Sequence, residues 1–311
     1  MTVSSPYAAA LGRVPVREEA VAVLGSTTRY WDYGERDATT TLVLVHGFRG
    51  DHHGLEPVVA QLDGIRMISP DLPGFGASTP MTEAAHDIVG YGRWLRAFVD
   101  GLGLAGRVVL LGHSFGSIVV AGALAEADGG GGAHSAAERP AGVVLVNPIG
   151  QPALEGPRGV FTRLAIFYYW LAAVLPERLG FALLRNRVIV RVMSMAMAKT
   201  KEPALRRWIH DQHDRYFSAF SDRQVVLEAF RASVSHDVSE YAGRIPERTL
   251  LVAAEKDDIT PIAAEYRLQT LFPDAELVVI PDVGHLIHYE TPAAAARAIQ
   301  RFVAELPGER A

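Results

Sequence analysis

Short aliphatic runs alternate with helix-like segments along this chain, and that alternation sets the strongest limit on its fold. Residues 88–99, for example, carry apolar side chains at the spacing of one helix face. The strand-like runs occupy residues 41–45, 65–69, 108–111, 143–146, 249–253 and 276–280. Aliphatic strands separated by helices are typical of a parallel sheet buried on both faces. The sequence therefore predicts an α/β fold with a doubly wound, mostly parallel sheet. Two weaker runs, 21–23 and 28–31, are expected to add antiparallel strands at its edge.

One long block interrupts the alternation. Residues 150–236 look helical throughout and contain no clear strand. We therefore expect an α/β core made of residues 1–149 and 237–311, with residues 150–236 forming a helical cap inserted between two sheet strands. Residues 128–140, which include four consecutive glycines, are expected to form a surface loop.

Composition excludes several classes of protein. Of the 311 residues, 49% are hydrophobic, which is enough for a large core. The 30 basic and 35 acidic side chains leave a net charge of -5, without a cationic footprint for nucleic acid. The absence of cysteine rules out disulfides, thiolate metal sites and cysteine nucleophiles. The first residues do not read as a secretory signal, so we expect a cytoplasmic protein.

Two further segments raise the questions of a membrane and of a metal. Residues 164–175 are apolar and uncharged, but a bilayer-spanning helix needs about 20 such residues. We expect an apolar lid helix and no transmembrane span, and a transient contact of the cap with lipid stays open. His210 and His213 lie beside Asp211 and Asp214 at a spacing compatible with a metal ion, although a solvated helix face is the better interpretation. We expect no metal and no organic cofactor; the sequence leaves the oligomeric state open.

The strongest chemical signal is Gly112-His113-Ser114-Phe115-Gly116, which fits the pattern G-x-S-x-G. It lies between a predicted strand and a predicted helix, where such a serine occupies a sharp turn and projects its hydroxyl above the sheet. The flanking glycines are needed because a side chain there would clash with the neighbouring backbone. The following helix directs its free N–H groups at developing negative charge, which makes Phe115 N–H a candidate oxyanion donor. Ser114 is therefore the candidate nucleophile.

A serine hydroxyl becomes a good nucleophile only when a base takes its proton. His285 follows the last predicted strand, at the sheet edge where open α/β sheets place ligand chemistry, and His288 is its rival three residues later. Asp257 and Asp258 both follow the preceding predicted strand, and either carboxylate can orient the base. Asn147 holds the equivalent position after an earlier strand and carries no charge.

With these residues the chain resembles the α/β-hydrolase superfamily, in its branch of capped esterases, lipases and carbon–carbon bond hydrolases. The resemblance covers residues 41–146 and 248–303, with the catalytic order Ser…Asp…His. It implies that the turn His46-Gly47-Phe48 supplies the second oxyanion donor, Phe48 N–H. It also implies a structural role for the turn Asp71-x-x-Gly74-x-Gly76-x-Ser78.

The same resemblance separates the remaining candidates. In that family the acid lies in an acidic loop that ends in a proline a few residues later. The segment Asp257-Asp258-Ile259-Thr260-Pro261 matches this loop, and the resemblance favours Asp257 over Asp258. The family's Gly-His pair precedes a Glu-x-Pro helix start, which matches Gly284-His285 and Glu290-Thr291-Pro292 and favours His285 over His288. Members that open epoxides or dehalogenate alkanes place Asp at the nucleophile position, and Ser114 argues against both reactions.

We therefore expect a serine hydrolase that cleaves a carboxylic ester with a lipophilic acyl or aromatic group through an acyl-enzyme. The alternatives are carbon–carbon bond hydrolysis, thioester cleavage or perhydrolysis on the same triad, and a non-catalytic ligand receptor or scaffold on this fold. Residues 48–53 do not form the Gly-Ser-rich loop of the carbon–carbon bond hydrolases, and this difference argues against carbon–carbon bond hydrolysis.

The expected partner is a small lipophilic molecule. The candidate pocket residues are Arg49, as a bidentate ligand for a substrate carboxylate, and the apolar side chains of Phe167, Trp170, Met193 and Met197. Dense apolar side chains in this block are also explained by packing of the cap on the core.

Overall fold

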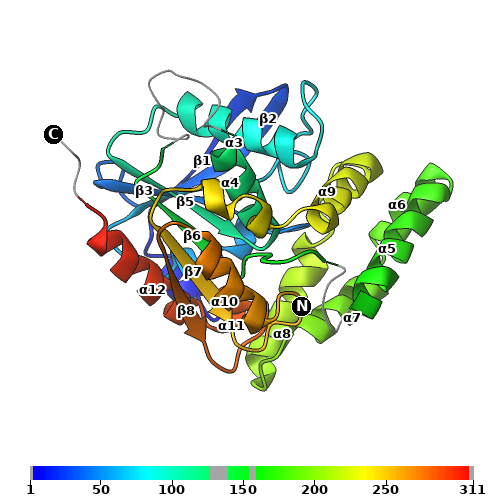
Figure 1. The fold of residues 1–311 in the computed structure, drawn as a ribbon. Coiled ribbons are helices and arrows are strands. Elements are labelled where there is room, and N and C mark those ends of the chain that lie inside the picture. The colour runs from blue at the N-terminus through cyan, green and yellow to red at the C-terminus, as the bar shows by residue number, and fades with distance from the viewer. Residues whose placement is uncertain (1–2, 127–138, 154–158, 308–311) are drawn as a thin grey trace.

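The structure is a computed structural model that describes residues 3–126, 139–153 and 159–307 (Figure 1). Within these ranges eight strands form one sheet in the order β1-β2-β4-β3-β5-β6-β7-β8. The strands are β1 (Val16–Val23), β2 (Ser26–Tyr33), β3 (Thr40–Val45), β4 (Arg66–Pro70), β5 (Arg107–His113), β6 (Gly142–Val146), β7 (Thr249–Ala254) and β8 (Ala275–Ile280). In sheet order, the strands β4, β3, β5, β6, β7 and β8 run parallel to one another. Strand β2 pairs antiparallel with both β1 and β4. The predicted doubly wound, mostly parallel sheet is confirmed.

The central strands bury both of their faces, which explains why they are aliphatic throughout. Successive residues of a strand face opposite sides of the sheet. In β3, Val43 and Val45 pack in one core cluster, whereas Leu42 and Leu44 pack in the other. The first cluster contains residues of α3 (Ile88–Gly101), α4 (Phe115–Ala125) and α10 (Ile262–Leu271), and the second contains residues of α2 (Glu56–Val59) and α12 (Pro292–Glu305).

Short polar side chains set the starts of several helices by capping their free N–H groups. Asp87 Oδ1 accepts a hydrogen bond from Gly90 N at 2.8 Å where α3 begins. Asp222 Oδ1 accepts one from Val225 N at 2.9 Å at the start of α9 (Arg223–Ser235). A cap of this kind stabilises a helix by about 1 kcal/mol, so these helix starts are encoded locally.

Between β6 and β7 the chain forms the inserted helices, which are α5 (Gly159–Val174), α6 (Glu177–Leu184), α7 (Arg187–Met197), α8 (Pro203–Tyr216) and α9. They lie beside the sheet, with α5, α6 and α7 farthest from it (Figure 1). Their attachment to the core includes two backbone hydrogen bonds, from Gly76 N to Ala219 O at 2.7 Å and from Ser221 N to Gly74 O at 2.9 Å. The inserted helices are therefore joined to the turn that follows β4.

Shorter helices complete the described ranges. They are α1 (Ala8–Leu11), η1 (His52–Gly54), η3 (Val238–Glu240), η4 (Ala242–Arg244) and α11 (Ile287–Glu290). Among the helices that the structure describes, none combines the length and the apolarity needed to cross a bilayer. Most of the expected glycine-rich loop, residues 128–138, lies outside the described residues.

Candidate active site

Ser114 occupies a strained turn between β5 and α4. Its backbone has φ 53° and ψ -119°, a left-handed conformation that is unfavourable for a residue with a side chain. The two flanking glycines allow this turn to approach its neighbours. A Cβ on Gly112 would lie 2.4 Å from Gly116 O, and one on Gly116 would lie 2.2 Å from Val45 O. The G-x-S-x-G pattern is therefore explained by contacts that only glycine permits.

His285 and Asp257 continue from Ser114 as a hydrogen-bonded chain. His285 Nε2 lies 2.8 Å from Ser114 Oγ, and His285 Nδ1 lies 2.7 Å from Asp257 Oδ2. Because a carboxylate only accepts, Nδ1 carries the proton, and Nε2 is free to accept the proton of the serine. Asp257 Oδ1 accepts a further hydrogen bond from Ile259 N at 2.7 Å, which orients the carboxylate. These side chains follow β5, β7 and β8, whose parallel carboxyl ends meet at one edge of the sheet.

The rival candidates have other partners. Asp258 forms an ion pair with Lys199, which lies between α7 and α8 of the inserted helices. His288 is buried on α11 with its ring centroid 4.1 Å from that of His113, and burial holds its pKa well below the usual value. The hydrogen bonds that lead to Ser114 are therefore made by Asp257 and His285. Neither Asp258 nor His288 takes part in them.

Two backbone N–H groups next to Ser114 are available to a ligand. The turn that follows β3 passes so close to the serine that a Cβ on Gly47 would lie 3.2 Å from Ser114 Cβ. Within the described ranges, neither Phe48 N–H nor Phe115 N–H donates a hydrogen bond to a protein acceptor. Phe115 is the first residue of α4, so its N–H also lies at the positive end of the helix dipole.

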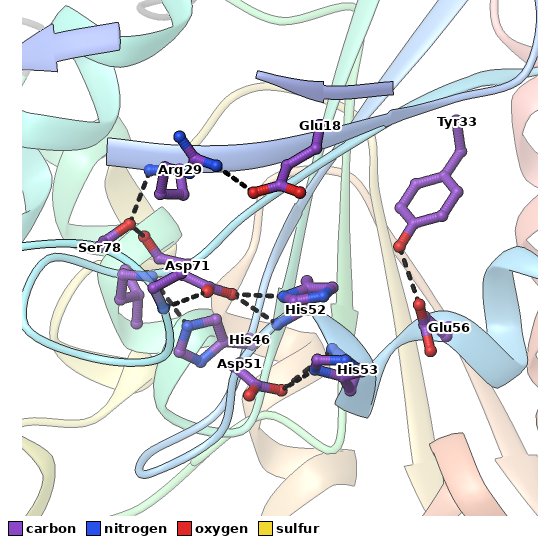
Figure 2. Close-up of polar contacts among 12 residues, drawn as sticks. Glu18, Arg29, Tyr33, His46, Asp51, His52, His53, Glu56, Asp71 and Ser78 are labelled. Atoms are coloured by element: carbon purple, nitrogen blue, oxygen red, sulfur yellow. Dashed lines mark hydrogen bonds and ion pairs between the residues drawn. The ribbon is translucent and has the colours of Figure 1, made fainter. Parts of the chain in front are cut away.

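The polar cluster in Figure 2 braces the turn that follows β3. His46 Nδ1 donates to Gly47 O at 2.8 Å, and His46 Nε2 accepts from Leu72 N at 2.8 Å. Asp71 Oδ1 accepts from both N and Nδ1 of His52, at 2.8 and 2.9 Å. A Cβ on Gly76 would lie 2.1 Å from the Asp71 carboxylate, which explains the glycine in this turn. The turn that includes Asp71 thus holds the loop after β3 in place.

Arg49 corrects an expectation from the sequence. It has a positive φ of 61° and is fully buried. Its Nη2 donates to Leu184 O at 2.6 Å, Nε to Phe217 O at 3.0 Å, and Nη1 to Tyr169 Oη at 3.2 Å. Because its nitrogens are taken by acceptors from the inserted helices and the residue after α8, Arg49 is not placed to bind a substrate carboxylate. Arg49 follows Phe48 in the chain, and its side chain connects the loop after β3 to three parts of the insertion.

The apolar pocket candidates are divided by the structure. Phe167 and Trp170 are 56% and 54% exposed and stack on each other, with ring centroids 5.7 Å apart. They lie on the outer surface of α5, so the expectation that they line a buried pocket is wrong. Met197 packs against the core cluster that contains Leu286, next to His285, and Met193 is half-buried on the same helix α7.

The sequence analysis assigned no role to two groups beside the site, Asn147 and Glu265. Asn147 follows β6 with φ 45°; its Nδ2 donates to His285 O at 2.6 Å, and its Oδ1 accepts from Ala254 N at 3.1 Å. It therefore holds the His285 loop against the end of β7. Glu265 on α10 is buried, and its carboxyl oxygens have no hydrogen-bond partner among the described residues.

Burial and the charge of Asp257 raise the pKa of Glu265 well above its usual range. A protonated Glu265 adds no second negative charge beside the carboxylate that faces His285. Its position three residues before the buried Leu268 on α10 is the pattern that could have placed it inside.

Two clusters have the residue types of a metal site. His210 and His213 each hydrogen-bond through Nδ1 to the buried Ser194 Oγ, at 2.6 and 2.7 Å. Both histidines are buried, so the expectation of a solvated helix face is wrong. The partner that they share is the hydroxyl of Ser194.

The other cluster is Asp51, His52 and His53, whose potential ligand atoms lie within 4.8 Å of one another. Both histidines already use Nδ1 in a bond to a carboxylate, Asp71 for His52 and Asp51 for His53. Each ring also stacks on an aromatic neighbour, His52 on Trp31 and His53 on Tyr216. These contacts explain the cluster as structural.

Three kinds of comparison with known proteins each match most of this chain. A family model described as the alpha/beta hydrolase family matches residues 42–298, a range that contains Ser114, Asp257 and His285. Haloalkane dehalogenase 2 of Mycobacterium tuberculosis is 30% identical over 253 residues, which cover 79% of this chain and 81% of that protein. Lipase 1 of Psychrobacter immobilis is 24% identical over 281 residues, which cover 86% and 78% of the two chains. A solved thermophilic esterase from Thermogutta terrifontis has a TM-score of 0.71 at 21% identity and covers 93% of this chain and 99% of its own.

Proposed function

The chain belongs to the α/β-hydrolase family, and from this membership and the site geometry we propose that it is a serine esterase acting on lipophilic acyl or aromatic esters. The observation that carries the proposal is the hydrogen-bonded chain from Ser114 Oγ through His285 to Asp257. This arrangement supports the proposal because acyl transfer requires a nucleophile, a base and an orienting carboxylate in that order.

In the first step, Ser114 Oγ attacks the ester carbonyl carbon while His285 Nε2 takes the hydroxyl proton. The carbonyl oxygen becomes an oxyanion that accepts hydrogen bonds from Phe48 N–H and Phe115 N–H. The tetrahedral intermediate collapses when His285 returns the proton to the leaving alcohol. The product is an acyl-enzyme ester on Ser114.

In the second step, His285 takes a proton from water, and the resulting hydroxide attacks the acyl carbon. The proton then passes to Ser114 Oγ as the carboxylic acid leaves. Asp257 keeps the proton of the neutral imidazole on Nδ1 and stabilises the imidazolium in both steps. Asn147 is a positioning residue, since its side chain binds the backbone of His285.

The nucleophile argues against dehalogenation, the reaction named for one relative. Attack by a serine hydroxyl on a haloalkane carbon would give an alkyl ether, which water does not cleave under the same base. Attack on an ester gives an acyl-enzyme, which water does cleave. Ser114 therefore suits acyl transfer better than alkyl transfer.

Aromatic side chains around Phe48 support a lipophilic acyl group. The Phe48 ring is half-buried, and its centroid lies within about 6 Å of four other rings. Those rings belong to Phe75, Phe115, Tyr169 and Phe230. We propose that the inserted helices act as a cap (residues 150–236) on the core (1–149 and 237–311), with Met193 and Met197 in its acyl pocket. The cytoplasm remains the proposed compartment.

A series of p-nitrophenyl esters from acetate to palmitate tests this proposal on the wild type and on Ser114→Ala. We expect the variant to lose activity by a factor of about 10³ or more, and the wild type to prefer a medium or long acyl chain. Ser233→Ala, on α9, is the matched control and should keep wild-type rates. Equal efficiency on all chain lengths would refute the lipophilic acyl pocket. A folded protein inactive on every ester would instead favour carbon–carbon bond hydrolysis or a receptor role.

A further inference from the structure

The outer inserted helices expose an apolar face. On α5 the exposed side chains are Leu164, Phe167, Trp170 and Val174, each more than half accessible to solvent. Their spacing of three or four residues places them on one side of the helix. On α7, Val188, Val192 and Met195 follow the same spacing and are between 59% and 72% exposed. We call these seven residues the apolar face of α5 and α7. Soluble surfaces rarely leave so many large apolar side chains uncovered.

The helices that carry this face, and α6 between them, are rich in positive charge. From α5 to α7 the chain carries five arginines, Arg163, Arg178, Arg185, Arg187 and Arg191, and one acidic residue, Glu177, for a formal charge of +4. The chain as a whole carries -5, so this charge is of the opposite sign to the rest of the molecule. In the part of the chain that the structure describes, Arg191 pairs with Asp214, whereas Arg163, Arg178, Arg185 and Arg187 have no ion pair.

We propose that the apolar face of α5 and α7 docks this protein on the surface of an anionic lipid bilayer. A surface-bound helix buries its apolar side in the acyl boundary while basic side chains contact anionic headgroups. Trp170 and Phe167 are suited to this depth, because aromatic rings favour the membrane interface. α5 has 16 residues, so it lies along the interface rather than across it.

Charge distinguishes this occupant from a second copy of the chain. A two-fold contact would place the same patch on both subunits and bring the unpaired arginines of one against those of the other. An anionic bilayer instead offers negative charge to the arginines and an apolar layer to the side chains between them. Each basic residue near such a surface strengthens binding.

The opposite side of α5 reaches the candidate active site. Tyr169 is buried, stacks on Phe230 with centroids 3.7 Å apart, and accepts a hydrogen bond from Arg49. Its ring also lies 5.9 Å from that of Phe48, the proposed oxyanion donor. One helix therefore contacts the proposed lipid surface and the loop beside Ser114. The docking itself rests on the surface chemistry, whereas delivery of a lipophilic ester from the bilayer rests on the proposed function.

Vesicle flotation tests the docking on the full chain. Wild-type protein is mixed with phosphatidylcholine vesicles with or without about 30% phosphatidylglycerol, and we expect it to float at least about tenfold more with the anionic vesicles. Added salt should release it, because screening weakens the arginine contacts. The triple variant Leu164→Ser/Val174→Ser/Val192→Ser should lose binding by about tenfold or more. Its matched control, Leu271→Ser/Val16→Ser/Val89→Ser, changes one leucine and two valines that are 45% to 53% exposed elsewhere on the surface, and it should bind as the wild type does.

A charge variant separates the two parts of the surface. Arg178→Glu/Arg187→Glu should abolish the preference for anionic vesicles, whereas Arg93→Glu/Arg297→Glu, with the same change in net charge, should retain it. Hydrolysis of the soluble p-nitrophenyl acetate should stay within about twofold in all four variants, so a failure of docking is distinguishable from a failure of the esterase proposal. Absence of wild-type binding, or equal loss in a control and its test variant, would overturn the docking. So would a dimer in gel filtration that dissociates in the triple variant.

Discussion

At the scale of single residues, the adjacent acids Asp257 and Asp258 differ only in what they contact. Asp257 accepts from His285 and from a backbone N–H of its own loop, whereas Asp258 pairs with Lys199. One residue along the chain therefore separates the proposed orienting carboxylate from a surface ion pair. That difference predicts opposite outcomes for the same chemical substitution.

Asp257→Asn should lower kcat on p-nitrophenyl butyrate by a factor of about 10³ to 10⁴. An asparagine amide donates toward Nδ1, which moves the imidazole proton to Nε2 and leaves no acceptor for the hydroxyl of Ser114. Asp258→Asn, the matched control, should stay within about threefold, because a partly exposed ion pair contributes little. Steady-state kinetics with circular dichroism as a folding check measures both. Comparable losses in the two variants would show that Asp257 is not the orienting acid.

At the scale of elements, Arg49 joins the loop after β3 to the inserted helices. Its three hydrogen bonds reach Tyr169 on α5, Leu184 at the end of α6 and Phe217 just after α8. The guanidinium also lies over the rings of Phe217 and Phe220, 4.9 and 5.2 Å from their centroids. This buried side chain thus helps to hold the insertion against the loop after β3.

Arg49→Met should destabilise the protein by about 3 kcal/mol, because it leaves the buried carbonyls of Leu184 and Phe217 without a donor. Amide hydrogen exchange should rise in α5, α6 and the end of α8, while β5 and β6 stay protected. Arg185→Met is the matched control: Arg185 is exposed and lies over the Phe181 ring, so its removal should cost less than about 1 kcal/mol. Unchanged exchange in the inserted helices of Arg49→Met would contradict this role.

At the scale of the whole molecule, several imidazoles are buried in their neutral form. Burial lowers the pKa of His113 and of His213 to about 3 from the ordinary 6.5, and it lowers that of His288 well below 6.5. Between about pH 6.5 and pH 3 the unfolded chain binds these protons and the folded chain does not. Stability therefore falls as the pH falls through that window, and each such histidine contributes about 1.4 kcal/mol per pH unit.

His288→Phe should remove one of these protons. The free energy of unfolding should then fall less steeply with decreasing pH, by about 1.4 kcal/mol per pH unit below pH 6. Little stability should be lost at pH 7, because His288 Nδ1 is buried and has no hydrogen-bond partner among the described residues. The measurement is urea unfolding of the variant and of the wild type at a series of pH values. Buried acids such as Glu265 have the opposite effect on the pH dependence of stability, but they are present in both proteins, so their contribution cancels in the difference. Parallel pH curves for the two proteins would contradict it.

Local patterns were sufficient for the sheet and for the nucleophile. Aliphatic runs of strand length, turn residues and the glycines around Ser114 act within a few residues, so they can be recognised along the chain. The helix predicted at 88–99 falls within α3, and the strand predicted at 143–146 falls within β6. The motif also predicted the strained backbone at Ser114, because that turn depends on its immediate neighbours.

Contacts between distant parts of the chain decided the rest. His285 and Ser114 are 171 residues apart, and Arg49 and Phe217 are 168 apart, so neither pair is marked by any local pattern. The same reason explains the errors. His210 and His213 look solvent-facing in sequence, and Arg49 looks able to bind a substrate carboxylate, yet other elements bury all three. Phe167 and Trp170 look suited to a pocket and lie exposed. Sequence alone determined where the strands, the turns and the serine of the G-x-S-x-G turn occur, because these are properties of neighbouring residues. The residues alone left two carboxylates and two imidazoles open, which only the family resemblance separated. Tertiary packing decided which of them make hydrogen bonds toward Ser114 and which apolar side chains stay exposed.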